Sequence, residues 1–146
     1  MLLSFSIDEM RPWIENGLQE AAGELAPGRV KRQTIRTLGP KYQRLFADSN
    51  SLHAVKLDLW WKSRRPERVK LGSVEGRATR IVITKPAWCD VEVRGADLEG
   101  FKLLGELEER RVMPFWWLDG FNSLEAFQKY FVPNDGDVFD GVLFTW

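Results

Sequence analysis

Short segments in which apolar and polar side chains alternate mark the expected strands of this chain. Residues 55–62 alternate with a period of two, which is typical of a half-buried strand. Segments of similar β-favouring character occupy residues 2–6, 78–84 and 90–94. Residues 142–146 are apolar at almost every position, which predicts a central strand that is covered on both faces.

Two segments have helical spacing. The first follows Ser6 and Glu9, which are spaced as in a capping box, and its core-facing side chains are Met10, Trp13, Ile14 and Leu18. The second follows Asn122 as its expected N-cap, with Glu125 three positions later, and its apolar face is Leu124, Phe127 and Phe131. Several strands framed by two helices predict an α+β fold, a small β-barrel with helices at its rim. We expect residues 1–146 to form a single domain.

Charge is balanced in total but divided along the chain. The 21 lysines and arginines equal the 21 acidic residues, which argues against the strongly basic coat of many nucleic-acid-binding proteins. Residues 1–80 nevertheless hold 15 of the basic residues and 9 of the acidic ones, a local excess of six positive charges. This asymmetry predicts either a basic face or two halves of opposite charge that attract each other.

The inventory of reactive side chains argues against several chemistries. One cysteine, Cys89, and one histidine, His53, cannot build a disulfide framework or a zinc cluster within the chain. We expect no metal and no cofactor, and we expect Cys89 to be a small buried apolar residue. The first residues lack the basic flank of a signal peptide, and no apolar run is long enough to span a bilayer. We therefore expect a cytoplasmic protein without a membrane partner.

Residues 31–36, Lys-Arg-Gln-Thr-Ile-Arg, concentrate cations, a hydroxyl and an amide in one segment. The segment also favours a strand, in which Arg32, Thr34 and Arg36 would share one face. Forked donors beside a hydroxyl suit a phosphate, a carboxylate or the edge of a base. For these arginines and for the neighbouring Arg29, contact with an anion or nucleic acid competes with ordinary solvated charge as the explanation.

Two further features suit nucleic acid without requiring it. Residues 63–68 are expected to form a charged hairpin tip or a mobile loop. Its arginines Arg64, Arg65 and Arg68 are either solvated or flank a groove that follows a nucleic-acid backbone. The adjacent pairs Trp60-Trp61 and Trp116-Trp117 are interpreted as core residues, with stacking on unpaired bases as the alternative.

Three motifs, taken in order, resemble the ASCH family of small β-barrels, which are related to the PUA RNA-binding domain. The first is Ile14-x-x-Gly17 at the end of the opening helix. The second is the Lys-x-x-Thr-Ile-Arg signature, here Lys31 to Arg36. The third is the turn Asp119-Gly120-Phe121, which leads into a short helix and a closing strand ending in Trp. The resemblance implies a PUA-like barrel that binds RNA or a nucleotide in a cleft between the Lys31–Arg36 strand and the Asp119 turn.

The resemblance also implies alternatives to simple binding. Some small bacterial members look like amidohydrolases acting on N4-acylated cytidine, in which a Lys activates a Thr nucleophile and a Glu completes the site. In this chain Lys31 matches the Lys, Thr34 matches the Thr, and Asp119 stands near the place of the Glu. A Lys can act as the base only when burial or a cationic neighbour lowers its pKa. A phage-related interaction factor without catalysis is the third hypothesis, since ASCH-like proteins of this size also occur in phage-derived gene sets.

Strand geometry sets a condition on any shared site. Lys31 and Thr34 are three positions apart, so in an unbroken strand their side chains would point to opposite faces. We therefore expect Lys31 to lie in a loop or a bulge before the strand, with Asp119 across the pocket.

Overall fold

The computed structural model describes residues 1–46, 52–87, 91–95, 100–103 and 115–146. Cys89 and Asp90 lie outside these residues, so the expectations that concern them fall outside the described part of the chain. The elements in order are β1 (Leu2–Phe5), α1 (Met10–Ala21), β2 (Gln33–Thr37), α2 (Pro40–Gln43), the 3-10 helix η1 (Arg44–Phe46), β3 (Leu52–Trp61), β4 (Val69–Thr84), β5 (Glu92–Gly95), β6 (Gly100–Leu103), α3 (Phe115–Asp119), α4 (Leu124–Phe131) and β7 (Val138–Thr145).

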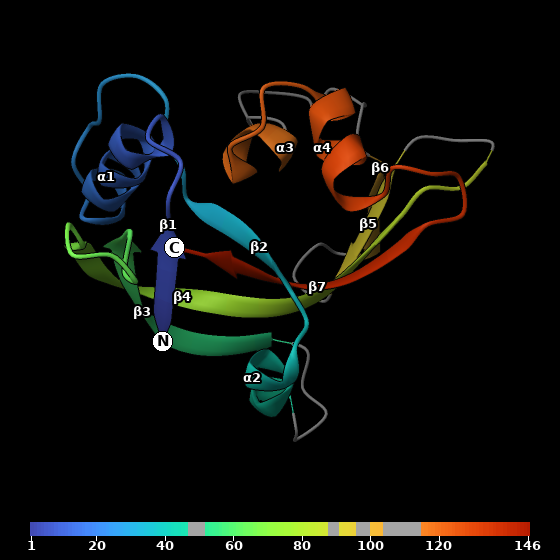
Figure 1. Ribbon diagram of the computed structural model, residues 1–146, viewed down its shortest axis with the longest axis horizontal. Helices are drawn as coiled ribbons and strands as arrows, with labels where there is room; N and C mark the ends of the chain where they lie inside the picture. Colours follow the sequence, from blue (N-terminus) through green and yellow to red (C-terminus); the bar gives the residue numbers. More distant parts are fainter. Residues whose placement is uncertain (47–51, 88–90, 96–99, 104–114) are drawn as a thin grey trace.

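The sheet is organised around β4, the longest strand. The first part of β4 pairs with β3, and its last part pairs with β7 on one edge and with β5 on the other. β1 continues the sheet beyond β3 in parallel orientation, and β2 continues it beyond β7 in antiparallel orientation. The sheet curls strongly into a half-barrel that carries short helices (Figure 1). The expected α+β class is therefore confirmed.

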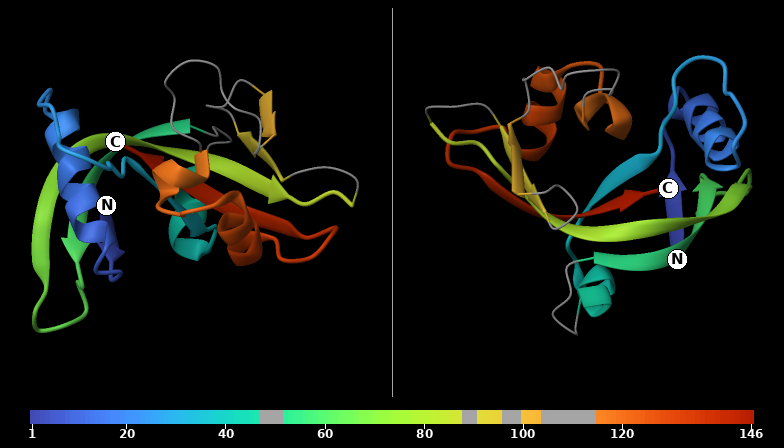
Figure 2. Two further views of the ribbon diagram at one scale, coloured as in Figure 1. Left: turned by 90° about the horizontal axis from the view of Figure 1, so that it is seen from above. Right: turned by 180° about the vertical axis from the view of Figure 1, so that it is seen from behind.

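β7 separates two apolar clusters, which confirms the expectation of a central strand covered on both faces. Its residue Leu143 packs in one cluster with Phe127 and Phe131 of α4. Its neighbours Val142 and Phe144 pack in the other cluster, with side chains of β1, β3 and α1. α3 and α4 accordingly lie on the opposite side of β7 from α2 (Figures 1 and 2). Each fully buried apolar side chain of this size contributes about 1.5–3 kcal/mol to stability.

Both expected helix starts are wrong, and local hydrogen bonding explains why. α1 begins at Met10 after Glu9, with no side-chain cap, because the chain first makes a turn in which Met10 N–H donates to the carbonyl of Ile7. That turn separates Ser6 from the helix. α4 begins one residue later than expected, since the hydroxyl of Ser123 accepts from Ala126 N–H at 3.0 Å.

α3 is a helix that the sequence pattern did not predict, and its end shapes the Asp119 turn. Gly120 N–H donates to the Trp117 carbonyl and Phe121 N–H donates to the Trp116 carbonyl, each at 3.0 Å. These two bonds form a Schellman motif, which requires a left-handed residue after the helix. Gly120 supplies it with a φ of 105°. The motif holds Asp119 at the C-terminal end of α3.

Candidate functional site

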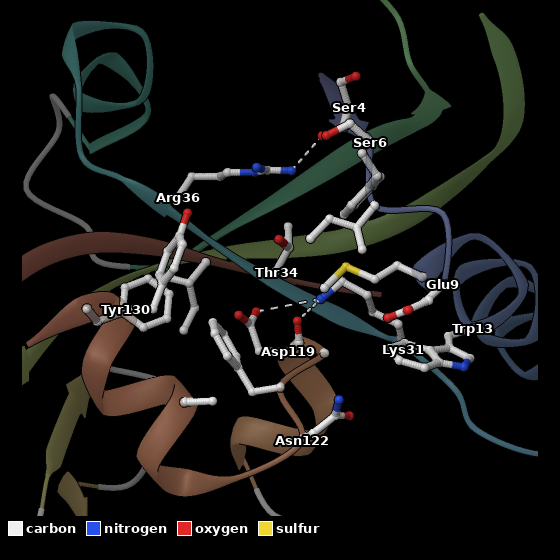
Figure 3. A pocket seen from close by; sticks show the side chains of 18 residues that line it. Ser4, Ser6, Glu9, Trp13, Lys31, Thr34, Arg36, Asp119, Asn122 and Tyr130 are labelled. Atoms are coloured by element: carbon white, nitrogen blue, oxygen red, sulfur yellow. Dashed lines mark hydrogen bonds and ion pairs between the residues drawn. The ribbon is translucent and has the colours of Figure 1, made fainter.

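A cavity of about 430 Å³ lies beside β2, at the edge of the sheet where the half-barrel stays open. β2 pairs with β7 along one edge, and its other edge pairs with no strand in the described part of the chain. Side chains of β1 and α1 line one wall of the cavity, and the turn after α3 and helix α4 line the other. Lys31, Thr34, Arg36 and Asp119 all line this cavity (Figure 3).

Lys31 precedes β2, which begins at Gln33, so the expectation that it lies before the strand is confirmed. Its backbone is fixed against α1, because its N–H donates to the Trp13 carbonyl at 2.8 Å. Its carbonyl oxygen lies against Gly17 so closely that a Cβ at position 17 would collide with it. Gly17 and Lys31, which belong to separate motifs, are therefore in direct backbone contact.

The Lys31 ammonium is buried against the end of α3. Its Nζ lies 3.8 Å from Oδ1 of Asp119 and donates a hydrogen bond to the backbone carbonyl of the same residue. The Asp119 carboxylate also accepts from the backbone N–H of Ile35, on the unpaired edge of β2. Oδ1 itself has no hydrogen-bond partner among the described residues. Asp119 therefore docks α3 onto β2 and presents a carboxylate with unused acceptor capacity.

Burial makes both charges of this pair easier to remove. Desolvation lowers the pKa of Lys31 to about 8, with the attraction of Asp119 opposing the shift and the cations Arg36 and Arg29 adding to it. Desolvation also raises the pKa of Asp119 to about 6, against the opposing effects of Lys31, Ile35 N–H and Arg36. The two pKa values thus converge on neutrality, a property that is concentrated in functional sites.

Thr34 lies in β2 opposite Phe144 of β7 and is buried. Figure 3 draws its side chain between the Lys31–Asp119 pair and Arg36. Within the described part of the chain, its hydroxyl makes no hydrogen bond. A ligand in the cavity therefore meets a hydroxyl that is free to donate or accept.

Arg36 bridges the open edge of the half-barrel. Its Nη2 donates to the backbone carbonyl of Ser4 in β1 at 2.7 Å, and its guanidinium lies 5.3 Å from the centre of the Phe5 ring. β1 and β2 are thus joined here through a side chain instead of a strand ladder. Because Arg36 also lines the cavity, its remaining donors can reach a ligand.

Arg29 and Arg32 are directed at the protein itself. The Arg29 guanidinium lies between the rings of Trp13 and Trp117, at 4.0 and 3.5 Å from their centroids. It donates to Asn122 Oδ1 and to the carbonyls of Trp117 and Phe121. Arg32 lies before β2 and its Nε donates to the Trp146 carbonyl at 2.5 Å, so the expected arginine face contains Arg36 but not Arg32.

The hairpin tip between β3 and β4 is exposed, as expected. Arg64 and Arg65 line a second cavity, of about 370 Å³, whereas Arg68 lies outside it. Of the expected anion-binding residues, only Arg36 lines the first cavity, and it lines the second one as well.

Sequence reasoning missed several side chains that line the first cavity: Ser4, Ser6, Glu9, Trp13, Asn122 and Tyr130. Tyr130 is 73% exposed and lies beside Phe121, at 5.6 Å between ring centroids. The sequence feature that could have indicated Tyr130 is its position on α4, because it is an aromatic residue outside the core-facing apolar stripe. None of the four tryptophans considered for stacking lines this cavity.

No group of three or more His, Cys, Asp or Glu side chains within the described residues is arranged to hold a metal ion. Over the same residues, no helix is long and apolar enough to cross a membrane. Comparisons with protein-family models, with curated proteins and with solved structures give no match to this chain. A functional assignment therefore rests on the cavity and on the motifs that build it.

Proposed function

We propose that this chain is a PUA-like protein of the ASCH type that binds RNA or a nucleotide in the cavity beside β2. One observation carries the proposal: Lys31 and Thr34 of the Lys-x-x-Thr-Ile-Arg motif line the same cavity, of about 430 Å³, as Asp119 of the Asp-Gly-Phe turn. Pockets for small ligands commonly measure about 300–1,000 Å³, so one nucleoside fits this volume.

The lining suits a base and its edge. Phe121 and the exposed Tyr130 offer aromatic faces, on which bases of any sequence can stack. Lys31, Thr34 and Asp119 offer donors and acceptors for the polar edge of the base. Buried ion pairs contribute little net stability, because desolvation offsets their attraction, so the position of the Lys31–Asp119 pair in the cavity supports a role in binding.

Isothermal titration with cytidine, N4-acetylcytidine and a short single-stranded oligoribonucleotide tests the proposal. We expect saturable binding of at least one probe, weakened about tenfold or more by Tyr130→Ala, because base stacking contributes roughly 1–3 kcal/mol. Tyr130→Phe keeps the ring and should retain the affinity, and Val138→Ala is the control at an exposed apolar position outside the cavity. Absence of binding to all three probes contradicts the proposal.

Amide hydrolysis of N4-acylated cytidine is a second candidate, favoured by the pKa of Lys31. With a pKa of about 8, roughly a tenth of Lys31 is neutral at pH 7 and can accept a proton. In this mechanism Lys31 takes the Thr34 proton, Thr34 Oγ attacks the acyl carbon, and the cytosine amine leaves with a proton. Water then releases the acid from Thr34, while Asp119 holds the Lys31 side chain in place.

Release of acetate from N4-acetylcytidine tests this second candidate. Thr34→Val should abolish turnover without a large change in melting temperature, whereas Thr34→Ser, which keeps a hydroxyl, should retain part of it. The rate should rise as the pH approaches 8, since more Lys31 is then neutral. Nucleoside binding without turnover leaves the binding function as the assignment.

A further inference from the structure

The second cavity adjoins the first one. Ser4, Ser6 and Arg36 line both, and the remaining walls of the second cavity come from β1, α2 and the β3–β4 hairpin. Arg36 is therefore placed where a ligand could touch it from either cavity. The two cavities therefore meet at Arg36, whose Nη2 donates to the Ser4 carbonyl between them.

The second cavity is strongly cationic in a chain whose net charge is zero. Five of its ten lining residues are basic and none is acidic; the basic ones are Arg36, Lys41, Lys62, Arg64 and Arg65. The charge of Lys62 is partly neutralised by two carboxylates that do not line the cavity, since its Nζ lies 3.6 Å from Asp8 Oδ1 and 4.0 Å from Glu67 Oε1. Like charges at this density repel one another unless an anion is present.

Among these cations, Arg64 and Arg65 have the side chains that are most available to a ligand. Both are exposed, and within the described part of the chain their side chains make neither a hydrogen bond nor an ion pair. The hairpin that carries them is held against β1, because Ser63 N–H donates to Ser4 Oγ at 3.1 Å. Lys62, with a left-handed φ of 46°, starts the turn, and Arg65 N–H donates to its carbonyl at 2.9 Å.

We infer that the second cavity binds the phosphate groups of a nucleotide whose base occupies the first cavity. Planar guanidinium groups and hydroxyls match phosphate oxygens in geometry and charge, and this cavity combines Arg36, Arg64 and Arg65 with Ser4, Ser6 and Ser63. The inference rests on the proposed function, and it assigns a place to the phosphate that RNA and nucleotides carry. Arg36 then lies between the base and its phosphate.

Calorimetric titration with cytidine, cytidine 5′-monophosphate and a cytidine trinucleotide tests the inference. We expect the monophosphate to bind at least tenfold more tightly than cytidine, with an advantage that shrinks as salt is raised from 50 to 200 mM. Arg64→Gln/Arg65→Gln should reduce that advantage to less than threefold. Arg68→Gln/Arg80→Gln removes the same charge outside the cavity and should keep it.

The outcomes separate the inference from the function on which it rests. Equal affinity for cytidine and its monophosphate, or an equal loss in both double variants, overturns the phosphate subsite and leaves nucleoside binding intact.

If no nucleoside binds, titration with inorganic pyrophosphate decides whether the second cavity binds anions. Pyrophosphate binding that Arg64→Gln/Arg65→Gln abolishes supports an anion subsite without the base site. Absence of pyrophosphate binding overturns the anion subsite. A trinucleotide that binds more tightly than the monophosphate identifies a nucleic-acid backbone as the source of the phosphate, and equal affinities identify a free nucleotide.

Discussion

Lys31 and Asp119 form an ion pair inside the protein, with 3.8 Å between Nζ and Oδ1 and with only 2% and 6% of their side chains exposed. Each partner compensates the other for the loss of water. The pair joins the segment before β2 to the end of α3, so it also holds the two sides of the cavity together. Removing one partner and removing both should therefore have very different consequences.

Replacing Lys31 alone should destabilise the protein strongly. Lys31→Met leaves the Asp119 carboxylate buried without its cation, which typically costs about 3–5 kcal/mol. Lys31→Met/Asp119→Asn removes both charges, while the amide oxygen can still accept from Ile35 N–H, and should recover stability to within about 1 kcal/mol of the original chain. Urea unfolding at pH 7.5 measures both values. A single variant as stable as the original chain contradicts the buried pair.

The contribution of Lys31 and Asp119 to the free energy of unfolding should pass through a minimum between about pH 6 and pH 8. The pKa of Asp119 is raised on folding, so its contribution to stability is complete below pH 3.8 and is lost as the pH rises through about 6. The pKa of Lys31 is lowered, so its contribution is complete above pH 10.5 and is lost as the pH falls through about 8. Urea unfolding across this range measures the curve, and the minimum should be absent from Lys31→Met/Asp119→Asn.

Gly17→Ala should disrupt the site through the backbone. The added Cβ collides with the Lys31 carbonyl oxygen, so either α1 or the segment before β2 must move. We expect a loss of about 3 kcal/mol in the free energy of unfolding, at the upper end of overpacking effects, and weaker ligand binding. Gly39→Ala is the matched control, because a Cβ there meets nothing within 4 Å, and its effect should stay below about 1 kcal/mol.

Arg29→Lys should lower stability although it keeps the charge. The lysine ammonium cannot lie flat between Trp13 and Trp117 while donating to Asn122, Trp117 and Phe121 together. We expect a loss of about 1–2 kcal/mol, accompanied by a change in the near-ultraviolet circular dichroism of the two tryptophans. Arg65→Lys, at an exposed position, should leave both measurements unchanged. A larger loss of stability in Arg65→Lys than in Arg29→Lys would contradict the stabilising role of the Arg29 guanidinium between the two tryptophans.

Elements with a strong local pattern were predictable from the sequence. The continuous apolar run of β7 and the periodic apolar stripe of α4 each extend over several residues, and tertiary packing agrees with both patterns. α3 was not predictable in this way, since five residues are too few to show a helical period and its tryptophans favour strands. The signal that was available is Gly120, the residue type that ends a helix in a Schellman motif.

The parts of the site that could be predicted are those carried by short motifs. The parity of Lys31 and Thr34 required Lys31 to precede the strand, and it does. The roles of Arg29 and Arg32 could not be predicted, because their partners, Trp117 and Trp146, are distant in sequence. Local capping rules predicted Asn122 as the helix cap, which is wrong, because Ser123 caps the helix. The Asn122 side chain instead accepts from Arg29, which is distant in sequence.

β1 and β2, which both carry residues that line the first cavity, lie at opposite margins of one continuous sheet. β3, β4 and β7 run between β1 and β2. The curvature of these three strands therefore sets the distance between β1 and β2 across the cavity. For the proposed ligand, the whole sheet therefore determines the size that the cavity admits. The register shift at Leu59/Trp60 in β3 faces Leu3 and Ser4 of β1, so a local change of strand geometry there adjoins Ser4, which lines the cavity.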